Sequence, residues 1–186
     1  MTIRKAKLED SEAIAPLLML ASGEVIYKFI GEEHYEKAVG FLLHFVKSEG
    51  NQYSYKHCYV AEEDKLIVAA ALVYDGAKLE GLRKPVLDYV HQHFDVNLNV
   101  EDETQAGEFY LDSFGVAPSQ QGKGLGSKML SFLIEEIVQK QGQTLGLLVD
   151  KTNPAAKKLY SKLGFEYVED KELLGFSMEH VQVKSH

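Results

Sequence analysis

The chain has 186 residues, 45% of them hydrophobic and 26% charged, which is enough apolar material for one domain and excludes a chain disordered by composition. Its net charge of −8 argues against nucleic acid as a partner, because nucleic-acid binding needs a basic surface. A single cysteine, Cys58, excludes an internal disulfide and a multi-cysteine zinc site.

No run approaches the ~18 consecutive apolar residues that a membrane span needs, so no membrane partner is predicted. The opening residues, 1–7, have no apolar run behind their charges and do not form a signal peptide pattern. We therefore expect a cytoplasmic protein whose residues 1–186 form a single domain.

In the first half of the chain, the spacing of apolar residues predicts two helices and three strands. Asp10 or Ser11 can cap the first helix. The predicted elements are a strand at 2–6, a helix after residue 11, a helix at 33–48, and strands at 57–61 and 66–74 that form a hairpin.

Residues 75–106 are predicted to be an insertion between strands. Gly81 and Pro85 interrupt this segment, residues 86–94 have a helical pattern, and residues 97–105 form a polar, acidic loop. About 30 residues cannot enclose a core of their own, so the segment is not a second domain.

The second half of the chain alternates strands and helices. The predicted elements are a strand at 108–116, a helix at 124–141, a strand at 145–149, a helix at 153–163, and strands at 165–168 and 173–183. Strand–helix–strand–helix–strand over 108–168 implies parallel pairing with right-handed crossovers, whereas the earlier strands form an antiparallel meander. The expected fold is therefore a mixed α/β (α+β) sheet with flanking helices.

A glycine-rich loop joins the strand at 108–116 to the helix that follows it. Gly122, Gly124 and Gly126 leave the N–H groups of the first helical turn open to an anion, and Lys123 and Lys128 add positive charge. A pyrophosphate fits this pattern. The Walker loop has the order Gly-Lys-Ser/Thr and the dinucleotide loop has G-x-G-x-x-G, so both nucleotide interpretations are weak. A tight turn with nothing bound remains an alternative.

Two motifs resemble those of the GCN5-related N-acetyltransferases (the GNAT family). The first is Gln121, Gly124 and Gly126 after the sequence Val116-Ala117-Pro118. The second motif has its five positions at Asn153, Ala156, Tyr160, Gly164 and Phe165. The resemblance is strong over 108–168, loose over the start and the middle strands, and absent over 75–106.

The resemblance implies a mixed, mostly antiparallel sheet with a central parallel strand pair. It also implies direct transfer of an acetyl group from acetyl-CoA to a primary amine, with Tyr160 as proton donor to the CoA sulfur and Asn153 near the cofactor arm. The strand at 109–116 would part from its parallel neighbour, so that backbone N–H groups near Phe114 and Val116 pair with the cofactor, Gly115 easing the approach. The full set of implied cofactor contacts is Phe114, Gly115, Val116, Gln121, Gly122, Lys123, Gly124, Leu125, Gly126, Ser127, Asn153, Ala156 and Tyr160.

Asp112 is a charged residue within an apolar strand, so it must be paired, solvated in a cleft or raised in pKa. The period of two places Asp112 on the side of Tyr110 and Phe114, opposite Ser113. We expect Asp112 to act near the acceptor, as a base through water or as an anchor for the amine, with a purely structural carboxylate as the alternative. Glu108, expected to be exposed, is the second candidate.

The histidines and the cysteine are expected to have no catalytic role. His91 and His93 are two residues apart on a predicted helix and make a poor metal pair, and Cys58 and His57 point to opposite faces of a strand. No metal and no acyl-cysteine intermediate are expected. The histidines expected on helix surfaces or in the tail are His34, His44, His180 and His186.

The acceptor has no visible signature, so a small-molecule amine and a protein or peptide amine both remain open, as does a homodimer. Residues 115–165 carry seven lysines and three acids, a net charge of +4, which leaves −12 on the rest of the chain. The basic segment would face phosphates and the acidic remainder could attract a cationic amine. The alternatives are a transferase of longer acyl chains, a non-catalytic CoA-binding sensor and a nucleotide-binding α/β protein.

Overall fold

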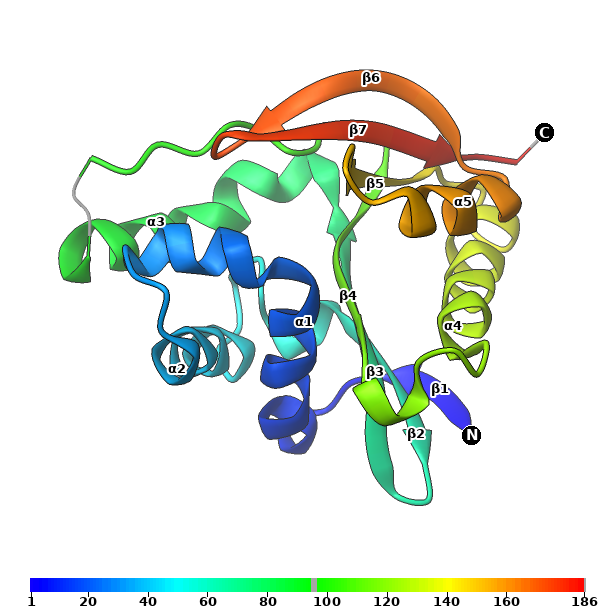
Figure 1. Cartoon of the computed structure of the whole chain (residues 1–186), viewed down its shortest axis with the longest axis horizontal. Coiled ribbons are helices and arrows are strands. Elements are labelled where there is room, and N and C mark those ends of the chain that lie inside the picture. Colours follow the sequence, from blue (N-terminus) through cyan, green and yellow to red (C-terminus); the bar gives the residue numbers. More distant parts are fainter. Residues whose placement is uncertain (95–96, 186) are drawn as a thin grey trace.

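The computed structural model describes residues 1–94 and 97–185, and its described strands form one seven-stranded sheet (Figure 1). The strand order is β1-β2-β3-β4-β5-β7-β6, and every neighbouring pair is antiparallel except β4 with β5. The strands are β1 (Thr2–Lys5), β2 (Cys58–Glu63), β3 (Leu66–Asp75), β4 (Phe109–Val116), β5 (Leu145–Asp150), β6 (Glu166–Leu173) and β7 (Phe176–Val183).

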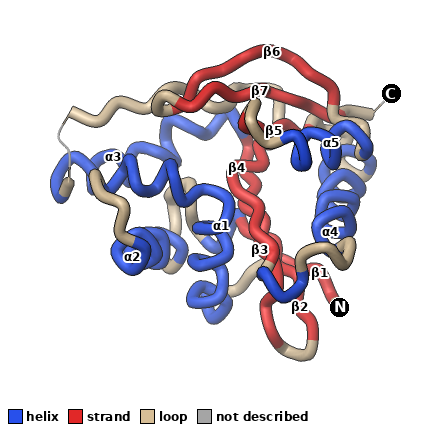
Figure 2. Tube along the Cα trace, viewed as in Figure 1, coloured by secondary structure: helices blue, strands red, loops and turns tan. Residues whose placement is uncertain are grey.

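Helices lie on both sides of the central strand β4, with α1–α3 on one side and α4 and α5 on the other (Figure 2). The described α-helices are α1 (Ser11–Ile30), α2 (Tyr35–Val46), α3 (Leu79–His93), α4 (Leu125–Leu133), which continues as a π-helical segment (Ile134–Gln139), and α5 (Pro154–Lys162). The predicted mixed α/β sheet with a central parallel pair is confirmed.

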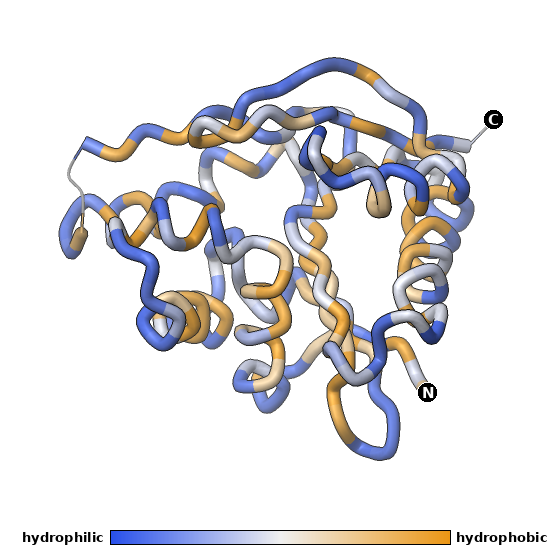
Figure 3. Tube along the Cα trace, in the orientation of Figure 1, coloured by the Kyte–Doolittle hydropathy of each residue, from blue (hydrophilic) through white to orange (hydrophobic). Residues whose placement is uncertain are grey.

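The apolar faces read from the sequence form two cores, one on each side of the sheet. On the α1–α2 side, Leu18 and Phe41 pack with Leu72, and on the α4 side Met129 and Leu133 pack with Leu147. Figure 3 shows the corresponding apolar stretches on α2 and α4, while the edge strand β6 is mostly hydrophilic.

The prediction that the strand near 165–168 pairs with its parallel neighbour is wrong. Strand β7 lies between β5 and β6 and is antiparallel to both. The reason is a tight turn at Leu174 and Gly175, both with positive φ, which returns the chain as a hairpin and inserts its last strand beside β5.

The prediction that Gly81 and Pro85 interrupt the 75–106 segment is also wrong, because both lie within α3. Both residues are on the exposed face of the helix. The N–H that Pro85 lacks would have bonded to the carbonyl of Gly81, and that carbonyl is free to bond to water instead. A proline on the outer side of a helix therefore costs less than its sequence position suggests.

The segment Leu8–Ile30, which contains α1, is long and apolar enough by length and composition to cross a membrane. Polar residues interrupt its apolar residues, so the search for an unbroken apolar run does not detect it. In the structure Ile14, Leu18 and Ile26 of this helix are buried in the core. A buried core helix satisfies the same length and composition criteria.

The contact between α1 and β4 depends on Gly115. A Cβ atom built on Gly115 would lie 1.8 Å from the carbonyl oxygen of Leu17, so the helix backbone rests directly on the strand. A second contact between α1 and β4 lies nearby, where the hydroxyl of Ser22 donates to the hydroxyl oxygen of Ser113 at 2.7 Å. The close approach predicted at Gly115 is that of the cofactor, whereas in the structure the backbone of the first helix occupies this position.

We expect Gly115→Ala to lower the free energy of unfolding by about 2 kcal/mol or more, because α1 would have to move away from β4. Chemical denaturation of the purified protein measures this. Gly81→Ala is the matched control, since its Cβ meets nothing within 4 Å and it lies on a helix, where alanine is favoured. Equal effects of the two substitutions would contradict the close contact.

Candidate active site

The parallel strands β4 and β5 are paired only at their first residues, Phe109 with Leu145 and Tyr110 with Gly146, and then part. On its other edge β4 stays paired with β3 as far as Val116. The N–H of Ala117 donates to the carbonyl of Val68 on β3 at 2.9 Å. Along a strand, successive N–H groups point to opposite edges. The N–H groups of Val116 and Phe114 therefore face the gap beside β5.

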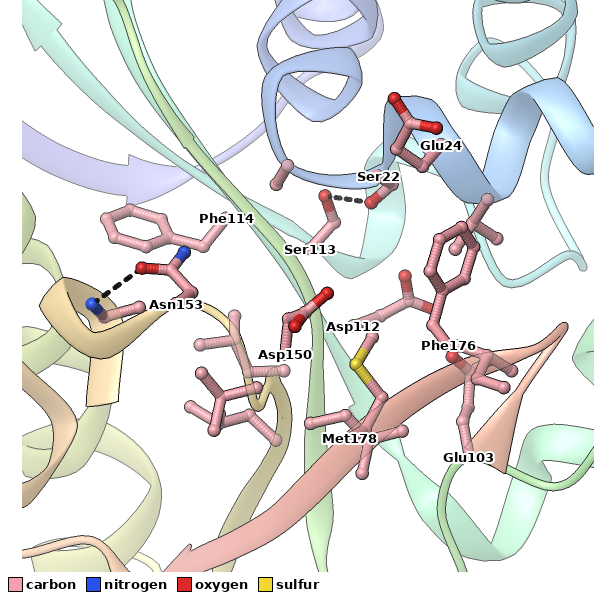
Figure 4. Close-up of a pocket in the computed structure, with 18 of the residues that line it drawn as sticks. Ser22, Glu24, Glu103, Asp112, Ser113, Phe114, Asp150, Asn153, Phe176 and Met178 are labelled. Carbon is pink, nitrogen blue, oxygen red and sulfur yellow. Dashed lines mark hydrogen bonds between the residues drawn. The ribbon is translucent and has the colours of Figure 1, made fainter. Parts of the chain in front are cut away.

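A cavity of about 700 Å³ occupies the space where these strands part. It is lined by residues from α1, β4, β5, α5 and the β6–β7 hairpin (Figure 4). Four carboxylates line it, and of the described residues in its wall none is Lys, Arg or His. The carboxylates are Glu24, Glu103, Asp112 and Asp150.

The glycine-rich loop lies at the entrance to α4. Gly122 and Gly124 have φ of 75° and 79°, a left-handed conformation that favours glycine, and α4 begins at Leu125 without a side-chain cap. The side-chain amide of Gln121 donates to the carbonyl of Val116 at 3.1 Å, which ties the loop to the end of β4. The N–H groups of the first turn of α4 are thus left for an anion.

The remaining predicted cofactor contacts in this loop are distributed between the surface and the core. Lys123 is exposed, and its ammonium group donates to the Gln120 side chain at 3.3 Å. Leu125 is buried in the core on the α4 side, Ser127 is partly exposed, and Gly126 lies against the ring of Phe114. Of the predicted contacts in this loop, Gln121 lines the cavity together with Phe114, whereas residues 122–127 are not among its described lining residues.

The second motif places its residues on α5, along the opposite wall. Asn153 is the N-cap of α5, since its side-chain oxygen accepts from the N–H of Ala156 at 3.0 Å. No residue of α5 is fully buried, and Ala156, Leu159 and Tyr160 line the cavity with one face of the helix.

Tyr160 has an edge-on ring contact with Phe165 at 5.6 Å between centroids. Its hydroxyl has no hydrogen-bond partner among the described residues, unlike that of a structural core tyrosine bonded to a carbonyl. Burial raises the pKa of Tyr160 to about 12, which keeps the hydroxyl protonated at neutral pH. A neutral phenol beside a cavity can donate a proton.

Asp112 lies in the cavity wall on β4 and keeps some exposure on the cavity side. Its Oδ2 accepts from the hydroxyl of Tyr74 at 2.7 Å and from the side-chain amide of Gln52 at 3.2 Å. Burial, followed by the nearby charge of Glu103, raises the pKa of Asp112 from 3.8 to about 8, against the opposing effects of Tyr74 and Gln52 hydrogen bonds. A carboxyl with this pKa can accept a proton near neutral pH.

The face predicted for Asp112 is partly wrong. A β-bulge shifts the register of β3 and β4 between Leu72 and Val73, so that Asp112 is the extra residue on β4. Beyond the bulge, Ser113 faces α1, where its hydroxyl pairs with Ser22, while Phe114 packs in the core on the α4 side. Asp112 therefore shares its face with Ser113 instead of Phe114.

The expectation that Glu108 is exposed is wrong. Its exposed fraction is 2%, and it is enclosed in a hydrogen-bond network away from the cavity wall. Its Oε2 lies 2.8 Å from Nε2 of His180 and accepts from Gln182 at 2.7 Å, while its Oε1 accepts from Thr104 at 2.5 Å. Burial works to raise the pKa of Glu108, but these hydrogen bonds outweigh it and hold the pKa below its usual value. His180, predicted at a surface, is fully buried on β7.

The thiol of Cys58 is buried, donates to the carbonyl of Ser54 at 3.7 Å and has its pKa raised to about 12 by burial, so it is a poor nucleophile. His91 and His93 bond to the carbonyls of Leu98 and Tyr89 respectively. In the described part of the chain, no group of three His, Cys, Asp or Glu side chains is arranged to hold a metal.

The exposed histidines on α2 agree with the sequence analysis. His34 is exposed and accepts from the N–H of Lys37 as the N-cap, and His44 is also exposed. His186 lies outside the described residues.

Comparison with known sequences identifies related acetyltransferases. A family model described as "Acetyltransferase (GNAT) family" matches residues 24–165. The spermine/spermidine N(1)-acetyltransferase of Bacillus subtilis is 33% identical over 85 residues, which is 45% of this chain and 54% of that protein. A mycothiol acetyltransferase of Kocuria rhizophila is 42% identical over 65 residues, 35% of this chain and 21% of that protein. The matches span about half or less of these curated relatives.

Solved structures match the whole chain. A crystal structure described as an acetyltransferase is 30% identical with a TM-score of 0.79 and covers 99% of both chains. An N-acetyltransferase from Staphylococcus aureus Mu50 has a TM-score of 0.84 at 21% identity, covering 98% of this chain and 100% of that chain. A Salmonella typhimurium protein solved with acetyl-CoA has a TM-score of 0.57 at 20% identity, covering 99% and 93%. The last two show a shared fold.

The raised pKa of Asp112 predicts a pH-dependent loss of stability. A carboxyl whose pKa is higher in the folded than in the unfolded chain binds more protons when folded, so stability falls as pH rises from about 4 to about 8. We expect Asp112→Asn, which keeps an oxygen for Tyr74, to raise the Tm relative to the wild type at about pH 9 and much less at about pH 4.

The control for this measurement is Asp88→Asn, at an exposed carboxylate paired with Lys84 on α3. Its effect on Tm is expected to be small, because exposed ion pairs contribute little. An Asp112→Asn effect on Tm that is the same at both pH values would contradict the raised pKa.

Proposed function

Because the chain belongs to the GNAT acetyltransferase family, we propose that it acts as a single N-acetyltransferase domain that transfers the acetyl group of acetyl-CoA directly to a primary amine. The observation that carries this proposal is the cavity between the parting strands β4 and β5. Its lining includes Gln121, from the loop that precedes α4, and the carboxyl of Asp112. An anionic cofactor and a cationic acceptor can thus enter one space.

The cofactor half of the site is made mostly of backbone groups. Acetyl-CoA, when bound, supplies the acetyl group as an activated thioester. The N–H groups of residues 124–127 and the positive end of the α4 dipole suit its diphosphate. The N–H groups of Phe114 and Val116 suit its pantetheine arm and the carbonyl of the acetyl group.

The acceptor half of the site favours a cation. Its wall contains Glu24, Glu103 and Asp112 together with apolar side chains such as Phe176 and Met178, and none of the described lining residues is basic. An amine arrives mainly as an ammonium ion, because its pKa is near 10. Asp112 accepts the proton from nitrogen, directly or through water, which leaves the nitrogen lone pair free to attack the acetyl carbon.

This electrostatic environment favours a small cationic amine over an acceptor that carries a carboxylate beside its amine. The match to a spermine/spermidine acetyltransferase supports an acceptor of the polyamine type. A protein or peptide amine is the second candidate, and it would need an extended chain to enter the cavity.

Tyr160 completes the proposed reaction as the proton donor. It lies on the α5 wall of the cavity with its hydroxyl protonated. Donation of that proton to the departing sulfur makes the free thiol of CoA. The acetylated nitrogen loses its second proton to solvent, and the tyrosinate regains a proton from solvent. Asn153 supports this wall by capping α5 and keeping its first turn in place.

We expect Tyr160→Phe to lower kcat by about 100-fold or more while leaving CoA affinity within about twofold, because the ring stays and only the donor is lost. The assay is thiol release from acetyl-CoA with a panel of diamines, polyamines, monoamines and amino acids, with calorimetry for CoA. Tyr167→Phe is the matched control, since that tyrosine is 60% exposed on β6.

The panel also separates the alternative functions. Tight CoA binding with no turnover on any amine would favour a binding module, and faster transfer from a longer acyl-CoA would favour a different acyl donor. An unchanged kcat in Tyr160→Phe would remove this residue from the chemistry.

We expect Gly124→Asp to weaken CoA binding at least about tenfold, because it places a carboxylate beside the amides that receive the diphosphate. Gly124→Asn is the matched control, since Asn and Asp both tolerate the left-handed backbone at this position and differ in charge. Calorimetry with CoA measures both. Equal affinities in the two variants would show that the diphosphate binds elsewhere.

A further inference from the structure

The segment between β3 and β4 contains a buried ion pair close to the acceptor half of the site. Nη2 of Arg83, on α3, lies 2.6 Å from Oε1 of Glu103, and the side chains are only 5% and 9% exposed. Glu103 also lines the cavity, whereas Arg83 lies behind it. A buried pair of this kind adds little net stability, so its position beside a reactive carboxyl calls for another explanation.

The segment that contains Glu103 is hydrogen-bonded both to α3 and to the β6–β7 hairpin. From α3, Nη1 of Arg83 donates to the carbonyl of Glu101 at 2.9 Å. From the β6–β7 hairpin, Lys171 donates to the carbonyl of Asp102 at 3.3 Å, and Leu174 donates its N–H to Oε2 of Glu101 at 2.8 Å. Residues 100–104 therefore form a fixed strap that holds Glu103 in the cavity wall.

Two tyrosines connect Glu103 to Asp112. The hydroxyl of Tyr110 donates to Oε2 of Glu103 at 3.3 Å, and the hydroxyl of Tyr74 donates to Oδ2 of Asp112 at 2.7 Å. The rings of Tyr74 and Tyr110 pack edge to face at 5.9 Å between centroids. The two carboxylates thus belong to one buried polar cluster with a single cationic member, Arg83.

The charge balance of this cluster is simple. Burial raises the pKa of Tyr53, Tyr74, Tyr110 and Cys58, so these groups are neutral. Glu24, an exposed residue of α1, lines the same cavity. With both carboxylates ionised, the cluster carries one uncompensated negative charge. The titratable and charged groups that face Asp112 are Tyr53, Cys58, Tyr74, Arg83, Glu103 and Tyr110.

We propose that the Arg83–Glu103 ion pair is a positioning device for the acceptor site, which holds the carboxylate of Glu103 in the same buried cluster as Asp112, the base that takes the proton from the amine. The inference rests on the proposed function. In the step concerned, one N–H bond of the ammonium breaks, its electron pair stays on nitrogen, and an O–H bond forms on Asp112. Arg83 donates to Glu103 at 2.6 Å and holds its carboxylate in place.

The test compares Glu103→Gln with Glu101→Gln, which removes the same charge from the same strap but at a side chain that bonds to Leu174 instead of lining the cavity. We expect Glu103→Gln to shift the acidic limb of the kcat/KM profile to lower pH by at least about one unit, because a negative charge near Asp112 is lost. Glu101→Gln and the conservative Glu103→Asp are expected to keep the wild-type profile.

A second readout does not depend on activity. Carbon-13 NMR of aspartate carboxyl groups follows the titration of Asp112 directly, with Asp112→Asn identifying its signal. The same downward shift in Glu103→Gln is expected there. If no amine is acetylated, the proposed function fails while this titration still decides the inference. An unshifted Asp112 titration in Glu103→Gln, or an equal shift in Glu101→Gln, would overturn it.

Should Glu103→Gln fail to fold because Arg83 is left unpaired, the double variant Arg83→Met/Glu103→Gln removes both charges, a change that buried pairs often tolerate. Glu103 acts on Asp112 more strongly than Arg83 does, so the double variant is expected to shift the titration in the same direction by a smaller amount. A shift to higher pH would contradict the proposal.

Discussion

The parting of β4 from β5 after two residue pairs determines everything else at this site. Parallel neighbours that stayed paired would satisfy each other's backbone groups and leave no space between them. Here the N–H groups of Phe114 and Val116 face the gap. The loop after β4 leads into the N-terminus of α4, which has no side-chain cap. One irregularity in the sheet thus leaves two sets of backbone donors unpaired, and the proposed cofactor half of the site accordingly relies on few particular side chains.

A second irregularity, the bulge at Asp112, supplies the acceptor half. Because Asp112 is an extra residue in the ladder, it and Ser113 face the same side, and its carboxyl lies beside Tyr74 and Gln52 instead of in the core on the α4 side. The strand after the bulge returns Phe114 to that core. The two irregularities therefore separate a backbone-lined region for an anion from a carboxylate-lined region for a cation on a single strand.

Sequence reasoning predicted the parts of the molecule that depend on local spacing. The helix faces, the hairpin of β2 and β3, the glycine loop and the cap at Asn153 each follow from a few adjacent residues. It failed where a distant partner decides the outcome: β7 enters between β5 and β6, Pro85 is tolerated on an outer helix face, and the bulge changes the face of Asp112. Glu103 and Arg83 gave no signal, because an acid in a polar loop and a basic residue on a helix meet only in the folded chain.

The network around Glu108 links the middle of the chain to its last strand. Gly146 has no side chain because a Cβ there would lie 1.9 Å from Oε2 of Glu108, and His180 and Gln182 bond to this carboxylate from β7. During synthesis, residues 108–150 leave the ribosome before β7 exists, so of the three side chains that bond to its carboxylate Glu108 at first has only Thr104. The carboxylate of Glu108 is therefore fully paired only once the C-terminal strand has been made.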